Sequence, residues 1–220
     1  MTFQVKICGI RDAATLDLAV RSGAGYVGFV FYPPSPRSLD IFAAAELAAG
    51  VPDEVASVGV LVDPDDRSLD GLLAHVALDI LQLHGDESPE RAAAVRERTG
   101  CRVMKALKVR EPEDLAAADR YRGAVDLIML DAKPRPGALL PGGNGEAIDW
   151  SILDGFAPPC PWALAGGLNP DNLSGAVAAT HAAIYDVSSG VERAPGIKDP
   201  DKVAAFLAVA RELRAAHPVK

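Results

Sequence analysis

Apolar segments that end in polar residues recur along the chain, and a stretch of helical character follows each of them. Continuous apolar runs of this length are typical of parallel strands that are buried on both faces. We predict eight strands, over residues 4–8, 26–31, 56–62, 80–83, 103–109, 127–130, 162–165 and 184–187. Eight strands that alternate with helices predict an α/β fold of the (β/α)8 barrel type, with residues 1–220 in a single domain.

Residues that can cap helices follow several of the predicted strands. Asp12 can cap the first helix and Gly23 can end it, whereas Asp63, next to Pro64, is interpreted as a helix-start or turn residue. The Gly- and Pro-rich segment 133–147 is too long for a plain strand-to-helix turn, and a loop of that length at the catalytic face of a barrel is usually functional. We expect helices over residues 13–22 and 39–49, after Asp65, Ser88 and Glu111, and from about Pro200 past Leu213.

The turn after the first predicted strand distinguishes the barrel from a doubly wound open sheet. An open sheet that binds a dinucleotide has the spacing Gly-x-Gly-x-x-Gly at this turn, whereas the chain has Cys8-Gly9-Ile10-Arg11-Asp12. The sequence therefore favours the barrel, whose active site is built at the C-terminal ends of the strands. Polar residues that are far apart in the sequence can then share one site.

Composition and charge narrow the class of function. The formal net charge is −8 and no basic run occurs, which argues against a nucleic-acid or anionic-membrane surface. No apolar run is long enough to cross a membrane, and the N-terminal residues have no pattern of a secretory signal. Three cysteines without a Cys-x-x-Cys pair fit a reducing compartment, so we expect a cytoplasmic protein. The four histidines lack the spacing of metal ligands, and no cofactor fingerprint occurs, so we predict neither a metal nor a cofactor.

The last two predicted strands are followed by small residues that suggest a phosphate site. Gly166 and Gly167 follow the seventh strand, and Ser188-Ser189-Gly190 follows the eighth. Small residues ahead of a helix start leave backbone N–H groups open to an anion, and barrels often bind phosphate between these two loops. The alternative is that the glycines only permit tight turns. Because the two loops occur together in the expected units, we predict phosphate binding.

Two candidate acid–base groups end predicted strands. Cys8 ends the first strand and shares its inward face with Lys6, for which Asp186 is a candidate partner. As a thiolate Cys8 can remove a proton, although an inert core thiol is the alternative. Lys6 and Asp186 fit a structural ion pair as well as an active-site role. Asp131 ends the sixth strand, where a carboxyl group can serve as a general acid or cap the next loop.

Two further side chains are placed where a substrate can reach them. His84 follows the fourth strand on the same face as Gln82, and it can contact substrate or remain an ordinary hydrogen-bonded histidine. Arg37 follows a proline-rich loop after the second strand, and its planar group can bind a carboxylate through two hydrogen bonds. Together these residues predict a cofactor-free barrel that acts on a small phosphorylated molecule by acid–base chemistry with Cys8 and Asp131.

The chain resembles the phosphoribosylanthranilate isomerase family of tryptophan biosynthesis. One departure lies at Gly142-Gly143-Asn144-Gly145, where the family usually has a threonine before the last glycine. The motifs that carry the resemblance follow the family order over nearly the whole chain: Lys6-Ile7-Cys8-Gly9, Gly28-Phe29-Val30-Phe31, Ser35-Pro36-Arg37, Gln82-Leu83-His84-Gly85, Leu130-Asp131, Leu164-Ala165-Gly166-Gly167-Leu168-Asn169-Pro170 with Asn172, and Asp186-Val187-Ser188-Ser189-Gly190-Val191-Glu192 with Gly196, Lys198 and Asp199.

The resemblance implies an Amadori rearrangement of N-(5-phosphoribosyl)anthranilate to 1-(2-carboxyphenylamino)-1-deoxyribulose 5-phosphate, without a cofactor. It implies that Cys8 is the general base and Asp131 the general acid, that Arg37 lies near the anthranilate carboxylate, and that the last two loops surround the phosphate. Family members occur as monomers and homodimers. Two alternatives remain: a dual-specificity isomerase that also serves histidine synthesis with a pair of aspartates, and a non-catalytic sensor of phosphorylated ligands. The cysteine at position 8 argues against the first, and intact Cys8 and Asp131 argue against the second.

Overall fold

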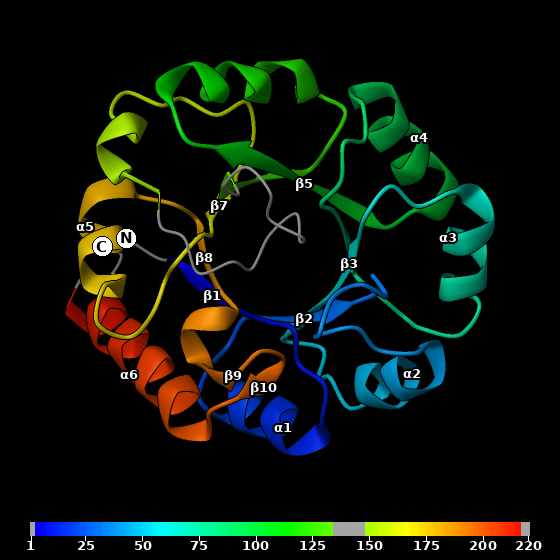
Figure 1. Cartoon of the computed structure of the whole chain (residues 1–220), viewed down its shortest axis with the longest axis horizontal. Helices are drawn as coiled ribbons and strands as arrows, with labels where there is room; N and C mark the ends of the chain where they lie inside the picture. The colour runs from blue at the N-terminus through cyan, green and yellow to red at the C-terminus, as the bar shows by residue number, and fades with distance from the viewer. Residues whose placement is uncertain (1–2, 134–147, 217–220) are drawn as a thin grey trace.

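The eight predicted strands form one closed parallel barrel (Figure 1). The computed structural model describes residues 3–133 and 148–216. Each strand pairs with its neighbour in sequence, and β8 closes the ring against β1 with Lys6 opposite Asp186. The strands are β1 (Gln4–Cys8), β2 (Tyr26–Val30), β3 (Ala56–Leu61), β4 (Ile80–Leu83), β5 (Arg102–Val109), β6 (Leu127–Ala132), β7 (Trp162–Leu164) and β8 (Ile184–Val187).

Helices surround the barrel on the outside (Figure 1). Several begin at a side-chain cap, because Asp12, Asp65 and Ser88 each accept a hydrogen bond from a backbone N–H of the first helical turn. The α-helices are α1 (Ala13–Arg21), α2 (Ile41–Ala49), α3 (Asp66–Leu73), α4 (Pro89–Thr99), α5 (Leu173–Thr180) and α6 (Pro200–Ala216). Three 3-10 helices, Pro112–Tyr121, Trp150–Leu153 and Ser189–Val191, and a hairpin of β9 (Glu192–Ala194) and β10 (Ile197–Lys198) complete the described elements.

The alternation of side chains along each strand produces two apolar layers and one polar layer. Residues that point outward pack against the helices in the larger core. Residues that point inward near the start of the strands fill the barrel with a second apolar cluster, which includes Ile80, Met129 and Ile184. Two residues further along the same inward faces, Gln82, Asp131 and Asp186 follow. The closed apolar interior therefore leaves the polar groups at the C-terminal ends of the strands, where the sequence places the site.

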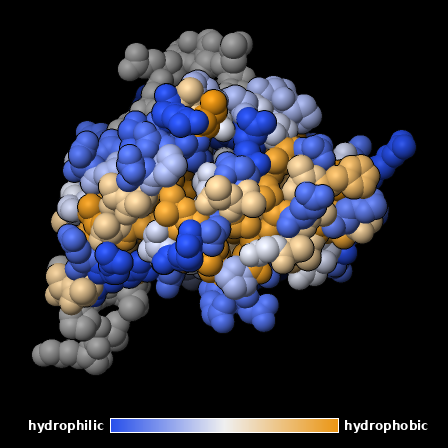
Figure 2. Space-filling model, turned by 90° about the horizontal axis from the view of Figure 1, so that it is seen from below, coloured by the Kyte–Doolittle hydropathy of each residue, from blue (hydrophilic) through white to orange (hydrophobic). Residues whose placement is uncertain are grey.

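The outer surface is largely polar. Among the described residues, only Phe42 and Ile197 are large hydrophobic side chains that are exposed. Figure 2 shows one side of the molecule, on which hydrophilic residues surround smaller hydrophobic areas. No helix in residues 3–133 and 148–216 is long and apolar enough to cross a membrane.

The predicted element bounds agree with the structure to within two residues, and two predictions need correction or extension. The helix expected after Glu111 is a 3-10 helix, in which Asp114 binds the N–H groups of Arg110 and Glu111 at the first turn. The hairpin β9–β10 was not predicted, because strands of three and two residues are too short to show an alternating pattern. Most of the predicted long loop, including Gly142-Gly143-Asn144-Gly145, lies outside the described residues.

Candidate active site

Cys8 lies at the mouth of the barrel, at the C-terminal end of β1. Its side chain is buried and packs with Val30, Val60 and the partly buried Tyr32. Burial raises the pKa of the Cys8 thiol, and the nearby Lys6 ammonium opposes this shift. Lys6 is completely buried, and its Nζ donates to Asp186 Oδ1 at 2.8 Å, which confirms the predicted pairing.

Asp131 reaches the mouth from β6, and a histidine and a backbone group fix its orientation. Its Oδ1 accepts a hydrogen bond from the Ala132 N–H at 2.9 Å, and its Oδ2 lies 3.2 Å from His84 Nε2. His84 Nδ1 in turn lies 2.8 Å from Gln82 Nε2. The His84 ring therefore bridges Gln82 and Asp131 and holds the carboxyl group in one position. The structure brings the two predicted residues His84 and Asp131 into direct contact.

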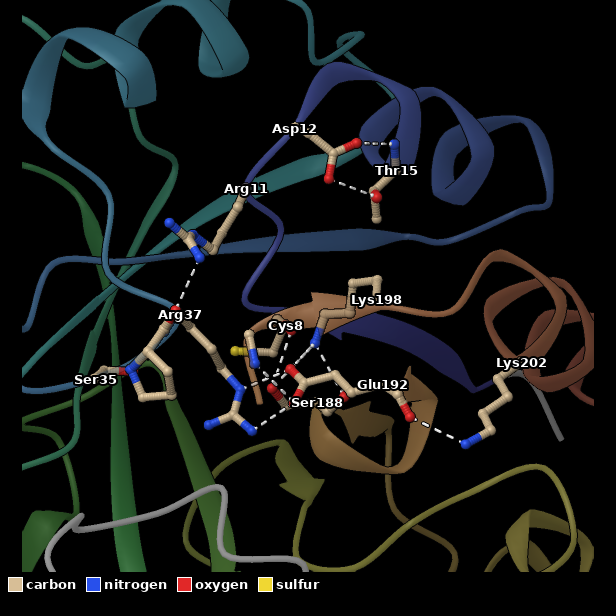
Figure 3. Close-up of polar contacts among 12 residues, drawn as sticks. Cys8, Arg11, Asp12, Thr15, Ser35, Arg37, Ser188, Glu192, Lys198 and Lys202 are labelled. Atoms are coloured by element: carbon tan, nitrogen blue, oxygen red, sulfur yellow. Dashed lines mark hydrogen bonds and ion pairs between the residues drawn. The ribbon is translucent and has the colours of Figure 1, made fainter. Parts of the chain in front are cut away.

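Arg37 is carried back to the mouth by the loop that follows β2. Ser38 forms a bridge with Val30, and the Leu39 N–H donates to the Val30 carbonyl at 2.9 Å, so the loop closes onto its own strand. Arg37 is buried, and its Nε and Nη2 donate to Glu192 Oε1 and Oε2, each at 2.8 Å (Figure 3). A bidentate pair of this kind fixes both the position and the plane of the guanidinium group.

Within the hairpin, Glu192 of β9 also accepts a hydrogen bond from Lys198 of β10 (Figure 3). Lys198 in turn connects the hairpin to the loop after β8. Burial alone would raise the pKa of Glu192, but Arg37 and Lys198 hold it below its ordinary value. Burial lowers the pKa of Lys198, and Glu192 opposes this shift. Lys198 Nζ donates to the Ser188 carbonyl at 2.9 Å, and the Ser188 hydroxyl donates to the Cys8 carbonyl at 3.1 Å. The hairpin is thus tied to both Arg37 and the Cys8 backbone.

The loops after β7 and β8 lie against each other, as the predicted phosphate site requires. A Cβ atom on Gly190 would lie 1.8 Å from the Leu168 carbonyl oxygen, so only glycine permits this approach of the two loops. Within residues 3–133 and 148–216, the backbone N–H groups of Gly166, Gly167, Ser189 and Gly190 donate to no other residue. Backbone donors on two touching loops, with no acceptor among the described residues, form a setting that suits an anion.

The chain is similar in sequence to known proteins. The family model for N-(5'-phosphoribosyl)anthranilate (PRA) isomerase matches residues 5–209. An N-(5'-phosphoribosyl)anthranilate isomerase of Paracoccus denitrificans is 55% identical over 208 residues, which cover 94% of this chain and 97% of the relative. The chain belongs to this family.

Solved structures of the PRA isomerase family have the same fold. Phosphoribosyl anthranilate isomerase from Thermus thermophilus matches with a TM-score of 0.85 and 34% identity, over 96% of this chain and all of that chain. Another isomerase of the family, in complex with reduced 1-(o-carboxyphenylamino)-1-deoxyribulose 5-phosphate, matches with a TM-score of 0.82, 34% identity and the same coverage. These matches confirm the (β/α)8 barrel and the resemblance found in the sequence motifs.

A buried ion pair near the mouth of this member of the PRA isomerase family, between Lys105 and Glu87, was also not predicted from the sequence. Lys105 of β5 donates to Glu87 Oε2 and to the Gly85 carbonyl, both at 2.7 Å, and Glu87 Oε1 accepts from the N–H groups of Asp63 and Gly85. The pair ties the loops after β3 and β4 together beside His84. The position of Lys105 between the apolar pairs Val103-Met104 and Ala106-Leu107 of β5 was the available signal, because a buried ammonium needs a carboxylate partner.

The sequence predicts no metal site in this protein. Among the residues that the structure describes, no group of three or more His, Cys, Asp or Glu side chains is arranged to hold a metal ion. Asp63, interpreted as a helix-start or turn residue, has a positive φ of 45° and its Oδ1 accepts from the Asp86 N–H. It is therefore a turn residue that joins two loops at the rim.

Proposed function

We propose that the chain, as a single (β/α)8 domain, isomerises N-(5-phosphoribosyl)anthranilate in tryptophan biosynthesis, with Cys8 as general base and Asp131 as general acid. The observation that carries the proposal is the placement of these two side chains. In a chain of the PRA isomerase family, they reach the same mouth from β1 and β6, which are separated around the ring by β7 and β8. A sugar bound at the mouth between them can meet an acid at one atom and a base at another.

The first step in this mechanism opens the sugar ring. The Asp131 carboxyl group, held by His84 and the Ala132 N–H, donates its proton to the furanose ring oxygen. The bond between that oxygen and C1 breaks, and the lone pair of the anthranilate nitrogen forms the C=N bond of a Schiff base. A fixed orientation favours this transfer, because the acid must lie within hydrogen-bond reach of the atom that it protonates.

The second step moves a proton from carbon. The Cys8 thiolate removes the proton on C2. The C2–H electrons form a C1–C2 double bond as the C=N electron pair returns to nitrogen, which gives an enolamine. The C2 hydroxyl then loses its proton and becomes the ketone, as the C1–C2 double bond takes up a proton at C1. Only the thiolate can act as this base, and burial raises the pKa of Cys8. The rate therefore increases with pH as the thiol ionises.

Substrate binding in this proposal uses both sides of the mouth. The N–H groups of Gly166, Gly167, Ser189 and Gly190, with Ser188 beside them, bind the phosphate. Arg37 pairs with the anthranilate carboxylate, and His84 and Asp186 line the sugar between the two ends. The Glu192 carboxylate supports the role of Arg37, because it fixes the plane of the guanidinium group in advance. No cofactor takes part.

Replacement of Arg37 separates recognition from chemistry. A charge-assisted hydrogen bond contributes roughly 1.5–3 kcal/mol, so Arg37→Ala is expected to lower kcat/KM by about 10–100-fold. Arg37→Lys is also expected to weaken binding, because a point charge does not replace the planar group. The measurement compares wild type and Arg37→Ala with the natural substrate and with an aniline analogue that lacks the carboxylate. We expect almost no loss with the analogue. An equal loss with both substrates would assign the carboxylate to another group.

A steady-state assay tests the proposed activity directly. Turnover of phosphoribosylanthranilate is followed as the loss of its fluorescence, and the corresponding phosphoribosyl intermediate of histidine synthesis is tested in parallel. We expect turnover of the first compound alone. Turnover of both would favour the dual-specificity isomerase, and binding without turnover would favour the sensor.

The proposal places the protein in the cytoplasm as a monomer or a homodimer. Sedimentation of the purified protein at assay concentration distinguishes the two states.

A further inference from the structure

Lys6 is a buried charge at the mouth to which the mechanism proposed above gives no role. Lys6 lies two residues before Cys8 on β1, on the same inward face, and it is completely shielded from solvent. Its ammonium is held by Asp186 of β8 at 2.8 Å. An ion pair placed there only for stability is costly, since hydrophobic residues of similar volume usually serve a barrel interior at least as well. The position of the ammonium next to the thiol calls for a chemical explanation.

Gly28 of β2 shows how close the two groups are. It is the register partner of Cys8. A Cβ atom at this position would lie 3.0 Å from Cys8 Sγ and 3.1 Å from Lys6 Nζ, so sulfur and nitrogen flank the same point of the neighbouring strand. Any side chain there would press against both groups. Because glycine has no side chain, the Lys6 ammonium and the Cys8 sulfur can both lie against the backbone of Gly28.

The charge balance around Cys8 favours a negative sulfur. Of the buried charged groups on β1, β8, the loop after β2 and the hairpin, three are positive and two are negative, and a thiolate would make this set neutral. Asp131, the buried carboxyl group that faces the mouth from β6, carries the acid proton in the proposed mechanism. Excess charge is expensive where water is excluded. The other residues of the cluster around Cys8 are Val30, Val60 and the partly buried Tyr32. The five buried side chains are Lys6, Arg37, Lys198, Asp186 and Glu192.

We propose that Lys6 is a positioning residue for the isomerisation, whose ammonium favours the thiolate form of Cys8, while Asp186 fixes the ammonium and moderates its effect. This inference rests on the proposed role of Cys8 as the base. It assigns opposite effects on the sulfur to the two members of the Lys6–Asp186 pair.

The electrostatics of the individual groups agree with this assignment. Burial raises the pKa of Cys8, the Lys6 charge lowers it, Asp186 raises it and Lys198 lowers it. Burial alone would lower the pKa of Lys6, but Asp186 and Cys8 hold it above its ordinary value. Lys6 therefore remains protonated near neutral pH, and it acts as a cation toward the sulfur.

Measurement of the thiol pKa in single and double variants tests the proposal. The variants Lys6→Met, Asp186→Asn and Lys6→Met/Asp186→Asn are made in a background of Cys101→Ser and Cys160→Ser, so that Cys8 is the remaining thiol. Thiolate absorbance in the ultraviolet is titrated against pH, with Cys8→Ser in the same background as the blank. The pH profile of kcat/KM with phosphoribosylanthranilate is recorded for each variant.

We expect shifts of opposite sign. Loss of an opposite charge at this range raises a thiol pKa by about one unit or more, so Lys6→Met is expected to lower kcat/KM at neutral pH by about 10-fold or more. Asp186→Asn is expected to lower the thiol pKa. The double variant is expected to lie between wild type and Lys6→Met, and it preserves the test if the single Lys6 variant does not fold.

Two outcomes would overturn the proposal. A thiol pKa that does not change in Lys6→Met, or one that shifts in the same direction in Lys6→Met and Asp186→Asn, would leave Lys6 and Asp186 as a structural pair. A thiol pKa that shifts as expected while kcat/KM does not follow would instead contradict the role of Cys8 as the base, which separates failure of this inference from failure of the proposed function.

Discussion

Asp131→Asn is expected to abolish most turnover while the substrate site remains intact. Asparagine has nearly the same shape, and its carbonyl oxygen can still accept from the Ala132 N–H. It has no carboxyl proton to give to the furanose ring oxygen, so the ring does not open. Loss of a general acid typically lowers kcat by ~10²–10⁴-fold. The measurement is kcat from the fluorescence assay, together with the dissociation constant of the reduced product by calorimetry.

The control for this variant is Asp154→Asn, an exposed carboxylate in the connection that enters β7. It carries the same chemical change away from the mouth and is expected to keep wild-type kinetics. If Asp131→Asn lost binding and turnover to the same extent, Asp131 would be a ligand-holding residue and not the acid. His84→Ala adds a further comparison, because loss of the bridge to Gln82 should lower kcat without removing the acid.

The barrel could be predicted from the sequence because its strands carry a strong local signal. Parallel strands buried between a core and a ring of helices must be apolar on both faces, and each ends abruptly where the barrel opens. All eight strands are in place, and Cys8 and Asp131 lie at the mouth as predicted. Strand alternation also predicted that Lys6 points inward, and its candidate partner Asp186 lies opposite it on β8.

The contacts among the site residues could not be predicted in the same way. Arg37 and Glu192 are 155 residues apart, and the hairpin that brings Glu192 and Lys198 to the mouth is too short to leave a pattern. The sequence predicts that Arg37 lies at the rim of the barrel, where it can reach a substrate. In the structure its side chain is buried against Glu192. Hydrogen-bond partners across a closed barrel depend on loop conformation, which local propensity does not encode.

The 3-10 helix after Glu111 shows a different limit. The sequence predicted a helix there correctly, since Glu111 and Asp114 form a reciprocal capping arrangement and Pro112 follows the cap. The α and 3-10 forms differ in whether each N–H bonds to the fourth or the third preceding carbonyl. Residue preferences for the two are similar, so the type of helix is decided by how the segment packs between β5 and β6.

Cys8→Ser is expected to produce a folded protein that binds substrate and turns it over very slowly. Serine differs from cysteine by one atom, and its smaller hydroxyl group fits beside Val30 and Val60. A hydroxyl does not ionise near neutral pH, so the C2 proton stays in place after the ring has opened. Loss of a general base lowers the rate by ~10²–10⁴-fold. The acid side of the pH profile should also lose the limb that reflects ionisation of the thiol.

The matched control for Cys8→Ser is Cys101→Ser. Cys101 is a partly buried thiol that donates to the Leu78 carbonyl at 3.4 Å, a contact that a serine hydroxyl can keep. It lies just before β5, away from the mouth, so its replacement is expected to leave kcat unchanged. The decisive comparison is a single-turnover experiment in which ring opening and proton removal are observed in sequence. In Cys8→Ser the Schiff base should accumulate, because Asp131 is intact and the base is missing. A Cys8→Ser enzyme with near-normal turnover would assign the proton transfer from C2 to another group at the mouth.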